Sequence, residues 1–119
     1  MALFSKLFGS GPAASEPPSE HAVIVSFAYG STNLQPIFDL EHKLERAINA
    51  ARAGQFDGNE VAVDGSDGSL YMYGPNADRL FATVKPILEA CSFMRGARVT
   101  LRYGPPEEGV RAQEVVLGA

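Results

Sequence analysis

The alternation of apolar and polar positions predicts where the strands of this chain lie. Residues 22–29 (AVIVSFAY) are largely apolar on both faces, which indicates a strand in the middle of a sheet. Residues 60–63 and 70–73 have β-prone patterns, and residues 64–69 between them contain two Asp-Gly pairs. Because Gly accepts positive φ and Asp can bond the nearby backbone, this arrangement predicts a β-hairpin.

Two further strands are predicted after a second helix. Residues 98–103 (RVTLRY) alternate cleanly between polar and apolar side chains, which is typical of a half-exposed strand. A loop over residues 104–109 then leads to a short last strand at residues 110–117.

The first predicted helix follows Asn33 and continues to about Ala53. Pro36 is tolerated in its first turn, and Gly54 stands just past its end, where a helix often stops. Apolar residues recur at helical spacing and form one inward stripe. The stripe consists of Ile37, Leu40, Leu44, Ala47, Ile48 and Ala51.

The second predicted helix starts at Ala77, after Asn76, whose side-chain oxygen can accept from the free amides of the first turn. Its inward stripe consists of Leu80, Phe81, Val84, Ile87, Leu88 and Cys91. Pro86 lies inside this helix, where it removes one backbone hydrogen bond and predicts a kink. The alternative is that the helix starts or breaks at Pro86 and shapes a pocket there.

The order of elements is β-α-β-β-α-β with one more strand, which predicts an α+β domain of the ferredoxin-like kind. Two helices are expected on one face of an antiparallel sheet, with the first and third strands central and an extra C-terminal edge strand. The other face of the sheet is expected to stay open. Residues 21–119 form this single domain, and residues 1–20 form a flexible N-terminal tip and a Pro/Gly/Ser linker.

Composition narrows the functional classes. The chain has 119 residues, of which 45% are hydrophobic and 20% charged, as expected for one ordinary domain. Its net charge of −4 provides no field that would attract nucleic acid or anionic lipid. Residues 69–73 (SLYMY) also lack the basic opening of the aromatic RNA-binding motif, so we expect no nucleic-acid partner.

The apolar segment from Met1 to Phe8 is too short for a signal peptide or a membrane span. We therefore expect no stable membrane association. The alternatives for this tip are disorder, docking into a groove, and transient membrane contact. The single cysteine, Cys91, fits a reducing compartment, and a cytoplasmic location is expected.

Strand parity predicts which side chains point away from the helices. The core set on the third and fourth strands is Leu70, Met72, Val99, Leu101 and Tyr103. The candidate binding residues are the outward set, Tyr71, Tyr73, Arg98, Thr100 and Arg102, with small Ser26 and Ala28 expected beside them. Tyrosine and arginine are enriched at binding surfaces because each combines contact area with directional donors. The alternatives for this face are simple solvation and the binding of a small anionic ligand.

No metal-binding or catalytic signature is complete. Asp39 and His42 form half of a carboxylate-histidine metal motif on one helix face, but the sequence supplies no second half. The acidic residues around the hairpin lack the spacing of a calcium loop and are explained by turn chemistry. They are Asp57, Glu60, Asp64 and Asp67. Cys91 is expected to be an unreactive thiol on the inward stripe. We therefore expect no metal, no cofactor and no catalytic residue.

The predicted function is a small non-enzymatic protein-binding or regulatory module. In this role Tyr71 and Tyr73 supply buried area, while Arg98 and Arg102 fix the register against carboxylates. The partner is another protein or a second copy, which would make a homodimer.

The alternative function is a small enzyme or a small-molecule sensor with a cleft between the sheet and the second helix, near Pro86. A flat surface of tyrosine and arginine beside a closed sheet-helix seam favours the binding module. A deep polar cavity that reaches Ser26 or Thr100 favours the sensor.

Overall fold

The computed structural model describes residues 20–118 of the chain. The predicted N-terminal tip and all but the last residue of the predicted linker lie outside the described residues. In chain order the elements are β1 (His21–Ala28), α1 (Gln35–Ala51), β2 (Gln55–Val61), β3 (Asp67–Gly74), α2 (Ala77–Glu89), the short 3-10 helix η1 (Ser92–Met94), β4 (Arg98–Arg102) and β5 (Ala112–Val116).

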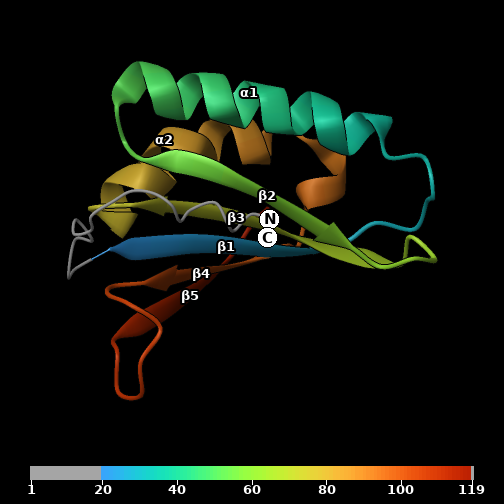
Figure 1. Ribbon diagram of the computed structural model, residues 1–119. Coiled ribbons are helices and arrows are strands. Elements are labelled where there is room, and N and C mark those ends of the chain that lie inside the picture. The colour runs from blue at the N-terminus through green and yellow to red at the C-terminus, as the bar shows by residue number, and fades with distance from the viewer. Residues whose placement is uncertain (1–19, 119) are drawn as a thin grey trace, which may run out of the picture.

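The five strands form one antiparallel sheet in the order β2-β3-β1-β4-β5. Both helices lie on the same side of this sheet (Figure 1). The predicted α+β class, with an antiparallel sheet and two helices, is therefore confirmed. The extra C-terminal edge strand is present, because β5 pairs with β4. The ferredoxin-like order is not matched exactly, since the sheet has five strands in the order given above.

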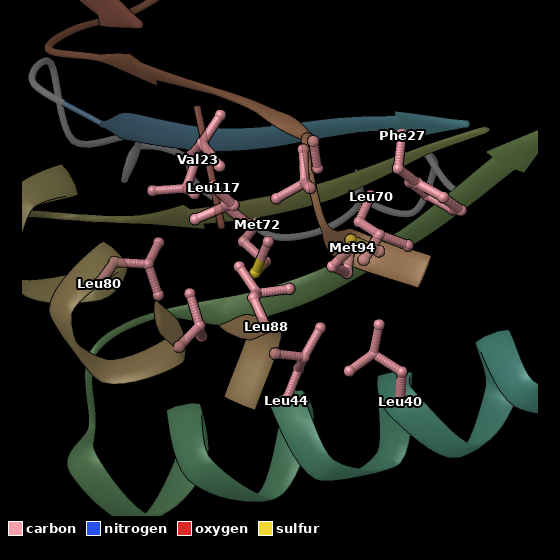
Figure 2. Packing of buried hydrophobic residues seen from close by; sticks show 14 of the residues in the cluster. Val23, Phe27, Leu40, Leu44, Leu70, Met72, Leu80, Leu88, Met94 and Leu117 are labelled. Carbon is pink, nitrogen blue, oxygen red and sulfur yellow. The ribbon is translucent and has the colours of Figure 1, made fainter. Parts of the chain in front are cut away.

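The hydrophobic core lies between the helices and the face of the sheet that they cover. Leu40 and Leu44 of α1 approach Leu88 of α2 and the sheet residues Leu70 and Met72 (Figure 2). The inward stripes predicted for the two helices are confirmed at Ile37, Leu40, Leu44, Ile48, Leu80, Val84 and Leu88, which are buried. The other predicted members are half-buried; they are Ala47, Ala51, Phe81, Ile87 and Cys91. On the sheet the same face buries Val23, Val25, Phe27, Leu70, Met72, Val99 and Leu101.

Helix α1 ends earlier than predicted, and Gly54 does not end it. Arg52 adopts the left-handed conformation with φ of 53°, and the amides of Arg52 and Ala53 donate to the carbonyls of Asn49 and Ile48. This pair of bonds is the Schellman arrangement, here with arginine at the position that usually holds glycine. Gly54 serves a different purpose, because a Cβ at this position would lie 2.0 Å from the backbone oxygen of Tyr73.

Strand β2 begins at Gln55, earlier than the predicted Glu60, and contains an irregularity. The register with β3 shifts between Phe56 and Asn59, around Gly58, which has φ of 110°. After this shift Asn59 pairs with Leu70 on the helix side, and Glu60 pairs with Ser69 on the opposite side. The bulge therefore decides which face of the sheet receives the Glu60 carboxylate.

The predicted hairpin is present, but its turn is displaced, because β2 ends at Val61 and β3 begins at Asp67 rather than at Leu70. This turn contacts the loop after β1. The Asp64 carboxylate accepts from the Ser66 amide at 2.9 Å, as turn chemistry predicts. The Gly65 carbonyl accepts from the Gly30 amide at 2.6 Å, and a Cβ at Gly65 would lie 2.0 Å from the Ser31 oxygen. This turn needs glycine because another backbone occupies the space of its side chain.

Helix α2 starts at Ala77 with Asn76 as its cap, as predicted, and the Asn76 side chain accepts from the Arg79 amide at 3.0 Å. The Nδ1 atom of His21 also accepts from the Ala77 amide, at 3.0 Å. The helix continues through Pro86 to Glu89. Among residues 20–118, neither this helix nor any other is long and apolar enough to cross a membrane.

Candidate functional site

The face of the sheet opposite the helices, which we call the open face, holds the five residues predicted from strand parity. The backbone register arranges this part of the face in three rows across β3, β1 and β4. The rows are Tyr73, Ala22 and Arg102; Tyr71, Ile24 and Thr100; and Ser69, Ser26 and Arg98. The face assignment follows from burial, because the alternate residues of β3 and β4 are all in the core. The binding role of the five residues stays a prediction.

Exposure changes along the open face from one end to the other. Ala22 is fully buried, Tyr73 and Arg102 beside it are half-buried, and so are the middle-row residues Ile24, Tyr71 and Thr100. In the third row Ser26 and Arg98 are exposed, and Val116, which pairs with Arg98 on the edge strand β5, is 51% exposed. The most accessible part of this face is therefore the end that holds Arg98.

Acidic neighbours hold the two tyrosines in their neutral, hydrogen-bonding form. The Tyr71 hydroxyl donates to Glu60 Oε1 at 2.6 Å, and this bond raises the pKa of Tyr71. Partial burial raises the pKa of Tyr73, and the Asp57 carboxylate raises it further, while Arg102 acts in the opposite direction. Both phenols therefore keep their protons at neutral pH. The Tyr73 hydroxyl can donate a hydrogen bond to a partner, whereas the Tyr71 hydroxyl, whose proton is donated to Glu60, can accept one.

The two arginines are oriented by different groups. Arg98 Nη1 lies 3.4 Å from Glu114 Oε1 on β5, and these side chains are 65% and 53% exposed. An ion pair with that exposure contributes little to stability, so Arg98 can exchange Glu114 for another carboxylate. Arg102 is fixed more firmly, because its Nε donates to the Gly104 carbonyl at 2.7 Å.

Three residues of the open face were not predicted as part of the site. Ile24 occupies the middle row, Glu60 accepts from Tyr71, and Glu114 pairs with Arg98. Strand parity alone could have placed Ile24 there. The two glutamates become visible only with the register of the edge strands.

Two features of the described residues concern metal binding and nucleophilic chemistry. No group of three or more His, Cys, Asp or Glu side chains that could hold a metal ion occurs among residues 20–118. Cys91 follows α2 and is half-buried rather than fully buried as predicted. Burial raises the pKa of its thiol, so the thiol stays protonated and weakly nucleophilic at neutral pH.

The hollow beside Pro86 is not the expected cleft between the sheet and α2. The groove beside Pro86 has a volume of about 420 Å³ and runs between α1 and α2. Its lining contains no residue of the sheet. A second hollow of about 490 Å³ lies at one end of the open face and is lined by Ser26, Asp67 and Arg98 among others. That hollow belongs to the open face itself.

Comparison of the chain with models of known protein families, with curated proteins and with solved structures finds no match. The function proposed below therefore rests on the open face alone.

Proposed function

We propose that this domain is a non-enzymatic protein-binding module that contacts its partner through the open face. The observation that carries the proposal is the set of side chains on a sheet face that no helix of residues 20–118 covers. Tyr71, Tyr73 and Ile24 supply apolar area there, and Arg98 and Arg102 supply directional donors. Tyrosine and arginine are among the residues that contribute most to binding when they lie near the centre of an interface.

The sheet provides a rigid platform for this role. In the proposal the strands β2-β3-β1-β4 are a ferredoxin-like unit, and β5 is an added edge strand. The core on the other face fixes the backbone under the site, so binding requires little additional ordering of the backbone. The proposal includes a cytoplasmic location, which the single cysteine supports.

The alternative of a sensor or a small enzyme has less support. Its expected cleft lies between the sheet and α2, whereas the groove beside Pro86 is formed by the two helices. The hollow that reaches Ser26 and Arg98 lies on the open face itself, not between the sheet and α2 where the sensor cleft is expected.

A photo-crosslinking experiment tests the proposal. A benzophenone amino acid replaces Tyr71 in the full chain, and the control chain carries it in place of Arg46, which is exposed on α1. After irradiation in the cells that make the protein, we expect a discrete protein adduct from position 71 and none of the same mass from position 46. The mass of the adduct identifies its partner as another protein or as the chain itself.

Adducts that are absent at position 71, or equal at both positions, would contradict the proposal. A competition arm sharpens the result. Unlabelled wild-type chain in excess should suppress the adduct from position 71, whereas an excess of the Tyr71→Ser/Tyr73→Ser double variant should not. Circular dichroism of the double variant checks that it is folded.

A further inference from the structure

Charge is distributed unequally across the open face. Strand β4 carries Arg98 and Arg102 and no acidic residue. Strands β2 and β3 carry Asp57, Glu60 and Asp67 and no basic residue. Strand β1 lies between the two sides, and on this face it presents no charged side chain. The basic and acidic sides of the open face are therefore separated by its central strand.

The edge strand β5 adds one acidic residue to the basic side, which still has more basic than acidic residues. Glu114 lies beside Arg98, but both side chains of this ion pair are more than half exposed. Arg102 has no acidic partner within 4.0 Å among residues 20–118. Its Nε donates to the backbone carbonyl of Gly104. On the opposite side the Tyr71 hydroxyl holds the Glu60 carboxylate in place on the face.

We propose that the partner of the open face is the same face of a second copy, related by a two-fold axis that runs along β1. This inference rests on the proposed function, for which it names the partner. A rotation about this axis places β4 of one copy over β3 of the other, and β5 over β2. The side with Arg98, Arg102 and a single acidic residue, Glu114, therefore meets the side with Asp57, Glu60 and Asp67. An axis across the strands would instead place β4 on β4 and bring arginines together, which is unfavourable.

The register along the strands fits the same axis. The rotation keeps each residue at its position along β1, so each row meets its own row in reverse order. Arg98 then lies over Ser69 of the second copy. Glu60 pairs with Ser69 on the neighbouring strand, so its carboxylate lies beside this contact. Arg102 lies over Tyr73, where a guanidinium group can stack on an aromatic ring. Ile24 lies on the axis and meets Ile24, which gives the interface an apolar centre.

The size of the face predicts a reversible dimer. Five strands about 4.8 Å apart, with about 3.3 Å per residue, give it an area of roughly 500 Å². A standard interface buries roughly 800 Å² on each partner. We therefore expect association in the micromolar range, which depends on protein concentration.

Complementary charge reversals test the axis. Sedimentation equilibrium is measured over a range of concentrations for the wild type, for Arg98→Glu, for Glu60→Arg, and for an equimolar mixture of the two variants. Each variant alone places like charges opposite one another twice, so its self-association should weaken by about 10-fold or more. The mixture should restore the wild-type affinity, because in a mixed dimer both contacts again join opposite charges.

Matched controls separate this contact from an effect of net charge. Arg46→Glu and Glu45→Arg make the same charge changes on the exposed side of α1 and should leave the association unchanged. The axis is wrong if the mixture associates no better than the single variants, or if the controls weaken association equally. Thermal unfolding of each variant confirms that it is folded.

A wild-type chain that stays monomeric up to about 1 mM would overturn the second copy as the partner. The proposed function would survive that result if position 71 still gave an adduct with a different protein. It would fail together with this inference only if position 71 gave no specific adduct.

Discussion

Folding partly buries the carboxylate of Glu41 and thereby disfavours its charged form. Glu41 is half-buried on α1, and burial raises its pKa, although the hydrogen bond from Asn59 Nδ2 and the nearby His42 act in the opposite direction. A carboxyl whose pKa is higher in the folded state binds its proton more tightly there. Its favourable contribution is therefore present at low pH and is lost as the pH rises through the folded pKa.

We expect Glu41→Gln to stabilise the protein at pH 7, by about 1 kcal/mol at most, because partial access to water screens the penalty. The glutamine keeps an oxygen that can accept from Asn59. The advantage should disappear below about pH 4, the ordinary range of a free glutamate, where Glu41 is protonated in both states. Urea unfolding at several pH values measures this difference. The exposed Glu108 of the loop before β5, changed to Gln, should show no such gain, and an equal gain there would refute the assignment.

At the scale of elements, the end of α1 is fixed by two groups that lie far apart in sequence. Arg52 takes the left-handed conformation, and the Arg79 guanidinium of α2 donates to the carbonyls of Ala51 and Arg52. These carbonyls belong to the last turn, which has no partners within the helix. Helix α2 therefore completes the C-terminus of α1 as well as packing beside it.

We expect Arg52→Gly to raise the free energy of unfolding by about 0.5–1 kcal/mol, because glycine accepts positive φ without the steric cost that arginine bears. The Arg79 hydrogen bonds involve backbone carbonyls and should persist. Arg46→Gly, in the interior of the same helix, should instead lower the free energy of unfolding by about 1 kcal/mol. Thermal unfolding of both variants distinguishes the two positions. A loss of stability in Arg52→Gly would show that its side chain contributes more than its conformation costs.

At the scale of the molecule, the sheet has two chemically different faces. One face is closed by the helices and holds the core, and the other exposes tyrosines, arginines and acidic residues. The stability of the fold therefore depends mainly on the first face, and the proposed binding depends on the second. Substitutions should separate the two properties.

Leu44→Ala should cost about 2–5 kcal/mol, because Leu44 is fully buried in the core and its loss leaves a cavity. Tyr73→Ala should cost about 1 kcal/mol or less and should abolish association through the open face. Chemical unfolding combined with light scattering measures both properties. If Tyr73→Ala destabilised the fold as much as Leu44→Ala, the assignment of Tyr73 to the open face would be wrong.

Much of the fold could be predicted because the spacing of apolar residues within each element indicates which side of that element is buried. The apolar stripes of α1 and α2, the cap at Asn76 and the two Asp-Gly pairs of the hairpin depend on residues within one segment. The same holds for the five predicted residues of the open face, since strand parity requires only that one face of β3 and β4 is buried. Local burial patterns therefore sufficed for these features.

Other features depend on contacts between distant segments, which no local pattern records. The position of Gly54 suggested the end of a helix, but the approach of the Tyr73 backbone is what requires glycine there. His21 had no evident partner in the sequence, and the fold brings it to the first amide of α2. The 3-10 helix at Ser92–Met94 has no turn or cap signal of its own.

The sequence by itself determined the helices, the hairpin, the class of the fold and the outward residues of β3 and β4, because these follow from which side of a single segment is apolar. Only the tertiary structure decided the order of the five strands, the bulge that turns Glu60 to the open face, and the separation of basic and acidic sides across β1. The physical reason is that register is set by hydrogen bonds between strands, and a shift of one residue would move every side chain of a strand to the other face.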